Sequence, residues 1–319
     1  MPRYVDVFNG DADGLCALQQ LRLADPVDAE LITGCKRDIA LLSRVRAGAD
    51  TIVTVLDISL ERNRAALEDL LAAQVRVRYF DHHFAGDIPQ SPLLEAHIDT
   101  AANVCTSVIV DRRLNGRFRP WAIVAAYGDN VIASAERLAD ASALDATGRA
   151  TLRTLGESLN YNAYGERIED LHIHPAALYR RLSSFDSPFD LVAREPIVQE
   201  LTALRAGDLA NALNVAPLAD HADYTVHRLP DEPWSRRVLG SFAHHLASTD
   251  STRAHAVLAP NRDGTMSASV RVAADSPVTA HAICLPFSGG GRQGAAGIDR
   301  LSPTETDAFV AALRAIRWR

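Results

Sequence analysis

The chain has 319 residues, with 33 lysines and arginines against 40 aspartates and glutamates, and a formal net charge of −7 at pH 7. This acidic balance argues against a broad basic surface for long nucleic acid, although it leaves room for a local basic pocket that holds a short nucleotide. A content of 47% hydrophobic and 23% charged residues is typical of a globular protein, and the length predicts two domains or one large domain.

The cysteines and the N-terminus narrow the class of protein further. The four cysteines form no CxxC pair, which argues against a disulfide framework or a zinc ribbon and favours reduced thiols in a cytoplasmic protein. The first residues, MPRYVDVFNGDADG, contain no charged leader followed by an apolar stretch, so we expect no signal peptide. No run of about 18 apolar residues occurs, so no membrane partner is expected.

The first third of the chain alternates between predicted strands and helices. Strands are expected over residues 4–8, 30–33, 51–57 and 75–80, and helices over 15–24, 38–47 and 60–73. The β-branched run TIVTVLD is typical of a strand buried on both faces, whereas the alternation in VRVRYF indicates a more exposed strand. This order of elements predicts a parallel sheet with right-handed crossovers.

The middle of the chain is predicted to be helical and the last third mixed. Helices are expected over 103–114 and 121–130, then polar helical stretches from about 135 to 215, ending in a connecting helix over 195–213. Further on, two β-rich segments flank NRDG and predict a hairpin. The sequence SPTE at 302–305 is a capping box with proline at the first helical position, and it predicts a helix over 303–316.

Acidic and imidazole side chains follow three of the predicted strands. Asp11 and Asp13 follow the first strand, Asp57 ends the run TIVTVLD, and the DHH triplet at 81–83 follows VRVRYF. An isolated aspartate after a strand is commonly a turn or a helix cap. Since open parallel sheets bind ligands at the carboxyl ends of their strands, we expect these residues to meet at one edge and to form a metal site.

The residue types also favour a particular metal. Carboxylates dominate, imidazoles are in the minority, and there is no thiolate, a set that suits Mn²⁺ or Mg²⁺ better than structural zinc. Several carboxylates around one point favour two cations about 3.5–4 Å apart, which activate water and hold a phosphoryl group.

The motifs together resemble those of the DHH phosphoesterase superfamily, and in particular its RecJ-like and nanoRNase-like members that cleave short nucleotides. The aspartates of DAD, the lone Asp57, DHH and YGDN resemble motifs I to IV, and SASVR and GGGRQGAAG resemble the two motifs of the DHHA1 domain. The resemblance covers nearly the whole chain. It implies a DHH domain with a mostly parallel sheet and a helical middle over 1–190, a connecting helix or linker over 191–215, and a smaller α/β DHHA1 domain over 216–319.

The resemblance also implies a role for each motif residue. Asp11 would bind the first metal ion and Asp13 the second, Asp57 would bridge the two ions, and His82 and Asp129 would complete the second site.

The remaining implied roles lie around the metal ions. His83 would lie nearer the substrate phosphate, and Asp81 would orient an imidazole. Many relatives have a histidine where this chain has Val7, and others have an aspartate where it has Asn9. Because an amide oxygen is a neutral ligand, the first metal ion is expected to be held loosely or to arrive with the substrate. Arg292 stands where the usual signature has histidine.

The C-terminal glycines predict an anion site. Gly289, Gly290 and Gly291 let backbone N–H groups approach an anion closely. Arg271 and Arg292 can each bind a phosphate through two parallel hydrogen bonds. A metal centre combined with an anion cradle on a second domain would select substrates by length.

These features predict a Mn²⁺-dependent phosphodiesterase that hydrolyses short linear oligonucleotides or dinucleotides, such as pGpG-type products, to mononucleotides. Aromatic residues make up only 6% of the chain, and a processive exonuclease would need a longer basic and aromatic track. Two alternatives stay open, a 3'-phosphoadenosine 5'-phosphate phosphatase and a non-catalytic nucleotide sensor. Base preference, cleavage polarity and oligomeric state, including a homodimer, are not readable from the sequence.

Overall fold

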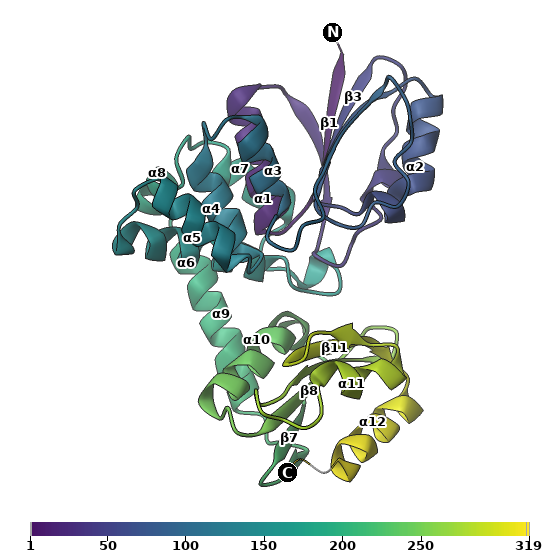
Figure 1. The fold of residues 1–319 in the computed structure, drawn as a ribbon, viewed down its shortest axis with the longest axis vertical. Helices are drawn as coiled ribbons and strands as arrows, with labels where there is room; N and C mark the ends of the chain where they lie inside the picture. Colours follow the sequence, from purple (N-terminus) through teal and green to yellow (C-terminus); the bar gives the residue numbers. More distant parts are fainter. Residues whose placement is uncertain (1, 317, 319) are drawn as a thin grey trace. The chain divides into compact units, whose positions relative to one another are not determined.

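The computed structural model describes residues 2–316 and 318. The chain divides into two compact units, Met1–Thr202 and Ala203–Arg319, and Figure 1 shows the elements of each. None of the helices among the described residues combines the length and the apolar character that crossing a membrane requires.

The first unit is built on a five-stranded sheet in which every pair of neighbours is parallel. Its strands are β1 (Arg3–Asn9), β2 (Ala29–Gly34), β3 (Thr51–Leu56), β4 (Arg76–Asp81) and β5 (Leu94–Ile98). The spatial order is β2-β1-β3-β4-β5. The chain therefore reverses its direction of progress across the sheet between β1 and β3, which is the topological switch point where open α/β sheets bind ligands.

Helices cover both faces of this sheet. On one face, α1 (Ala12–Ala24), α3 (Thr106–Arg113) and α4 (Arg119–Gly128) share a core with the strand residues Phe8 and Phe80. On the other face, α2 (Leu60–Ala72) and the short 3-10 helix η1 (Leu41–Arg44) cover a layer of valines from β1, β3 and β4. Successive residues of a strand point to opposite faces, so the buried runs predicted for these strands supply both cores.

The rest of the first unit is helical, and α6 packs behind α4. The elements are α5 (Ile132–Ala141), α6 (Ala146–Asn162), the 3-10 helix η2 (Ile168–Asp170), α7 (Pro175–Leu182) and α8 (Pro188–Arg194). The following helix, α9 (Ile197–Leu213), runs from the first unit into the second. The helical middle predicted from the sequence is confirmed.

One local expectation for the first unit is wrong, and one strand was missed. Residues 38–47 form no α-helix, because the Asn63 side chain accepts from the Leu42 N–H and donates to the Ile39 carbonyl, which leaves only η1. The strand β5 was not predicted. The strand β4 is exposed at Arg76 and half-buried at Arg78, as its alternation predicts, and it is buried from Tyr79 to its end, where β5 pairs with it.

The second unit has a mixed six-stranded sheet in the order β10-β11-β9-β8-β7-β6. Its strands are β6 (Ala219–Asp220), β7 (Tyr224–Arg228), β8 (Ala254–Pro260), β9 (Met266–Arg271), β10 (Gly290–Gly291) and β11 (Ala295–Leu301). One core contains α10 (Pro233–Thr249), and another contains α11 (Ala280–Cys284) and α12 (Pro303–Ala315), while Leu285–Phe287 form the 3-10 helix η3. The predicted β8–β9 hairpin and the predicted capping box at Ser302 are confirmed.

The predicted fold class is therefore confirmed: an α/β chain with a parallel sheet, a helical middle, and a smaller C-terminal α/β unit.

Candidate metal centre

The first strand ends in a helix cap made by one of the predicted ligands. Asp11 follows β1 and is the N-cap of α1, and its Oδ1 accepts hydrogen bonds from the backbone N–H groups of Asp13, at 3.0 Å, and Gly14, at 3.1 Å. Helix capping therefore uses Asp11 Oδ1 and leaves Asp11 Oδ2 to bind another partner.

Asp13 is held by the N-terminus of another helix. Its two carboxylate oxygens accept from the backbone N–H groups of Thr106, at 2.6 Å, and Ser107, at 2.7 Å, which open α3. The Ser107 hydroxyl also donates to the Asp13 carbonyl at 3.0 Å. Free N–H groups at a helix start favour negative charge, so α3 fixes the position of a completely buried carboxylate.

Asp57 lies at the end of β3 in an unusual backbone conformation. Its φ is 59°, in the left-handed region, and its N–H donates to the Phe80 carbonyl on the neighbouring strand at 3.0 Å. The side chain is 2% exposed, and its Oδ1 accepts from the Thr106 hydroxyl at 3.1 Å. Backbone strain of this kind persists where the surrounding structure enforces it, which is common at functional sites.

The two histidines of DHH have different partners. His82 Nδ1 lies 3.0 Å from the Val104 carbonyl, which only accepts, so Nδ1 carries the proton and Nε2 presents a lone pair. That Nε2 lies 3.4 Å from Asp57 Oδ1 and 3.8 Å from Asp129 Oδ2. His83 Nδ1 lies 2.7 Å from Oδ1 of the buried Asp81, and the His83 side chain is 43% exposed.

The predicted motif IV aspartate, Asp129, directly follows α4 and its carboxylate joins this cluster. Burial, together with the charges of Asp11, Asp13 and Asp129, raises the pKa of Asp57 well above its usual range. Burial also raises the pKa of Asp129, although the charge of Lys36 opposes this. Burial alone would raise the pKa of Asp11 too, but the charge and hydrogen bond of Lys36 hold it below its usual value.

Lys36 is a member of the cluster that sequence reasoning missed. Its Nζ lies 2.6 Å from Asp11 Oδ2, 3.1 Å from Asp129 Oδ1 and 3.3 Å from Asn160 Oδ1. The signal was present, because Lys36 follows the carboxyl end of β2 and therefore obeys the same strand-end rule as the aspartates. Asn160, which comes from α6, has no comparable signal in the sequence.

The residues present fit a divalent cation. Among the described residues, two groups place one ligand atom each within 4.8 Å of one another: Asp57 with His82 and His83, and Asp13 with His82 and Asp129. Asn9 Oδ1 is buried and has no hydrogen-bond partner, which is the kind of orphaned oxygen that an ion can satisfy. Oxygen donors with one or two imidazoles match the preferences of Mn²⁺ or Mg²⁺.

The predicted anion-binding residues gather at one corner of the sheet in the second unit. Arg271, the last residue of β9, pairs with Ala295 of β11, and the Arg292 N–H donates to the Ala295 carbonyl at 2.7 Å. Gly290 and Gly291 form the exposed edge strand β10. Gly291 has a φ of 148°, and an added Cβ there would lie 2.4 Å from Ala296 Cα.

Some polar groups in this corner already have partners. The Gly289 N–H donates to the Cys284 carbonyl, and Arg271 Nη1 donates to Ser269 Oγ at 3.0 Å and to the Val270 carbonyl at 2.9 Å. The structure thus brings the predicted glycines and arginines together, and the glycines lie in a tight hairpin.

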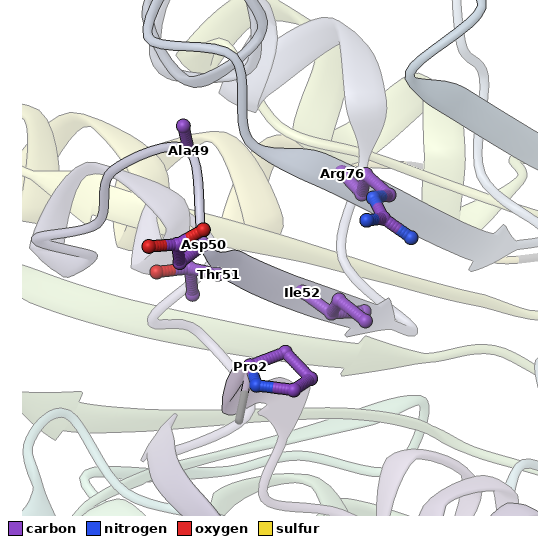
Figure 2. A pocket seen from close by; sticks show the side chains of 6 residues that line it. All are labelled: Pro2, Ala49, Asp50, Thr51, Ile52 and Arg76. Atoms are coloured by element: carbon purple, nitrogen blue, oxygen red, sulfur yellow. The ribbon is translucent and has the colours of Figure 1, made fainter.

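A pocket of about 320 Å³ lies at the other end of the first unit's sheet (Figure 2). Thr51 and Ile52 open β3 and Arg76 opens β4, so this pocket lies at the amino ends of the strands. Its lining residues are Pro2, Ala49, Asp50, Thr51, Ile52 and Arg76. It shares no residue with the carboxylate cluster.

Of the comparisons with known proteins, only the comparison with solved structures found similar proteins. No protein-family model matches the chain, and no curated protein does. Exonuclease RecJ bound to manganese is 19% identical, with 99% of this chain and 93% of that chain covered and a TM-score of 0.60. RecJ from Thermus thermophilus in complex with Mn²⁺ is also 19% identical with a TM-score of 0.60, and this chain covers 51% of its length.

A third similar structure is the pGpG-specific phosphodiesterase PggH from Vibrio cholerae. It is 14% identical, with 98% of this chain and 97% of that chain covered, and its TM-score is 0.52. These likenesses span nearly the whole chain, and both RecJ and PggH are DHH/DHHA1 proteins. The chain therefore has the same fold as RecJ and PggH, and the fold that the motif resemblance implies is confirmed.

Proposed function

We propose that this protein is a metal-dependent phosphodiesterase that hydrolyses short linear oligonucleotides, dinucleotides above all, to mononucleotides. The observation that carries the proposal is the convergence of carboxylates and imidazoles from three strand ends on one point, with ligand atoms within 4.8 Å of one another. The similar structures support it, since one is an exonuclease solved with manganese and another is a pGpG-specific phosphodiesterase.

In this proposal the centre has positions for two Mn²⁺ ions, with Mg²⁺ as the alternative. Asp13, His82 and Asp129 would hold the second ion, Asp57 would be shared, and Asp11, with Asn9, would hold the first. Bound divalent ions supply Lewis-acid activation of water and neutralise phosphoryl charge. Asp13 is suited to its part because α3 fixes both its oxygens before any ion arrives.

His83 has a separate role, which is to bind the scissile phosphate. Burial lowers the pKa of His83, but the hydrogen bond and charge of Asp81, together with the charges of Asp129 and Asp13, raise it above its usual value overall. The protonated ring is thereby favoured, so its Nε2–H can donate to a phosphoryl oxygen while its Nδ1–H stays on Asp81. Because the side chain is 43% exposed, a substrate can reach it.

Arg271 and Arg292 of the second unit are proposed to bind a phosphate of the substrate. Arg271, Arg292 and the hairpin at Gly290 and Gly291 form a corner suited to a terminal phosphate. A short substrate also agrees with the net charge of −7, which disfavours a long nucleic acid track.

A panel of substrates tests the proposal. Metal-free protein is supplied with Mn²⁺ and then given pGpG, pApA, longer single strands and 3'-phosphoadenosine 5'-phosphate, with products separated by chromatography. We expect mononucleotides from the dinucleotides, at a higher kcat/KM than from longer strands.

Other results would assign a different function. Release of inorganic phosphate from the bisphosphate, without cleavage of dinucleotides, would make the protein a phosphatase. Tight binding of a nucleotide without turnover would make it a sensor. Faster degradation of the long strands would contradict the selection for short substrates.

A further inference from the structure

Lys36 is held in the carboxylate cluster by the end of α6. Its backbone N–H donates to the Ala163 carbonyl, just after α6, at 2.9 Å, and Asn160 of α6 contacts its Nζ. Asn160 is itself oriented, because its Nδ2 donates to the Tyr164 hydroxyl at 2.8 Å. The lysine therefore reaches the acidic groups from a fixed base rather than from a loose surface position.

The composition of the chain makes this position unusual. Lys36 is the only lysine among the 33 lysine and arginine residues, so arginine serves as the cation everywhere else. An ammonium group is a compact point charge, whereas a guanidinium is a wide planar fork. The carboxylates of Asp11 and Asp129 lie close together. The compact ammonium group of Lys36 fits between them as a metal ion would, whereas a guanidinium is too wide to do so.

Lys36 uses the oxygen that Asp11 would offer to an ion. Asp11 Oδ1 already caps α1, and Oδ2 accepts from Lys36 Nζ at 2.6 Å. Among the described residues, Asp11 accordingly belongs to neither group with ligand atoms close enough to hold an ion, although Asp13 and Asp57 each belong to one.

The side chain at position 9 does not offset the competition between Lys36 and the first ion for Asp11 Oδ2. Asn9 would contribute a neutral oxygen to the first ion, and hard divalent cations gain affinity with each added carboxylate. The second ion meets less competition, because Lys36 contacts only Asp129 among its ligands Asp13, His82 and Asp129. That contact uses Asp129 Oδ1, whereas Asp129 Oδ2 lies 3.8 Å from His82 Nε2.

We propose that the Lys36 ammonium group occupies the position of the first divalent ion while no substrate is bound, so that the resting protein binds one Mn²⁺ ion per chain. The inference rests on the proposed function only in taking the cluster to be a metal centre. It concerns binding in the absence of nucleotide, so it can be tested without any measurement of activity.

The test is a count of bound ions. Metal-stripped full-length protein is titrated with Mn²⁺ without nucleotide, and binding is followed by calorimetry and by the electron paramagnetic resonance signal of the free ion. We expect one ion per chain for the wild type and two for Lys36→Gln. The matched control is Arg37→Gln, which removes a positive charge from the exposed neighbouring residue and is expected to leave the count at one.

Two results would overturn the inference: two ions bound by the wild type, or one ion bound by a folded Lys36→Gln variant. If that variant fails to fold, as judged by circular dichroism, the wild-type count still decides, because two ions with Lys36 present contradict the proposal. The wild type could bind one ion and Lys36→Gln two, while neither protein hydrolyses a nucleotide. That result would overturn the proposed function and leave this inference standing.

Discussion

Replacement of Asp57 by asparagine is expected to abolish turnover and to preserve the fold. Asparagine has nearly the same shape and can still accept from the Thr106 hydroxyl. It also tolerates the left-handed φ of 59° at this position, whereas alanine there costs roughly 1–2 kcal/mol. Asp57→Asn thus removes the charge alone, and Asp57→Ala removes the charge and strains the backbone.

The expected magnitudes follow from this difference. Loss of a ligand shared by two ions should cost several kcal/mol of transition-state stabilisation, and about 4 kcal/mol corresponds to roughly a thousandfold lower kcat. Without metal, Asp57→Asn should unfold above the wild-type temperature, because burial and the neighbouring aspartates raise the pKa of Asp57 and make its ionised form unfavourable. Asp57→Ala should unfold about 2–8 °C below Asp57→Asn.

The raised pKa of Asp57 also determines how the stability of the metal-free protein changes with pH. A carboxyl group whose pKa is raised by folding lowers stability when it ionises, so the wild type gains stability as the pH falls through the raised pKa. The advantage of Asp57→Asn should therefore shrink at acid pH. Thermal melts in a chelator and rate measurements with Mn²⁺ test both parts. Residual kcat above about a tenth of wild type, which is less than 1.4 kcal/mol, would refute the shared-ligand role.

Four further substitutions have defined outcomes. Arg271→Gln and Arg292→Gln should each raise KM for a dinucleotide more than they lower kcat, since a remote phosphate contact contributes uniform binding; a lower kcat with KM unchanged would place that arginine at the reacting phosphate. Asn9→Asp should tighten Mn²⁺ binding and lower the Mn²⁺ concentration for half-maximal rate, and unchanged affinity in calorimetry would show that position 9 does not reach the centre. Asp81→Asn should lower the pKa of His83 in the metal-free protein, because the hydrogen bond and charge of Asp81 are the largest contributions that raise it, and an NMR titration of the imidazole that shows no shift would contradict this assignment.

The strand-end rule explains how much of the site the sequence could predict. Buried β-branched runs located β1 and β3, and the residues just after them, Asp11, Asp13 and Asp57, do lie together at the switch point of the sheet. Local chemistry was enough there, because a parallel sheet brings the carboxyl ends of its strands to one edge.

Tertiary contacts explain what the sequence could not predict. The helix expected over 38–47 is replaced by a 3-10 turn because Asn63, distant in sequence, satisfies its backbone groups. The position of Lys36 after β2 obeys the strand-end rule, but its partners were not predictable, because Asp129 and Asn160 lie 93 and 124 residues further along the chain. Neither pairing leaves a periodic or compositional trace in the sequence.

The most direct test of the central claim is a metal add-back experiment with pGpG. Metal-stripped wild-type protein and Asp57→Asn are incubated with the dinucleotide, first in a chelator and then with excess Mn²⁺, and the products are separated by chromatography. We predict that wild-type protein releases mononucleotide only after Mn²⁺ is added and that Asp57→Asn releases none. Equal cleavage with and without the metal, or equal cleavage by the two proteins, would contradict a phosphodiesterase centre built on these carboxylates.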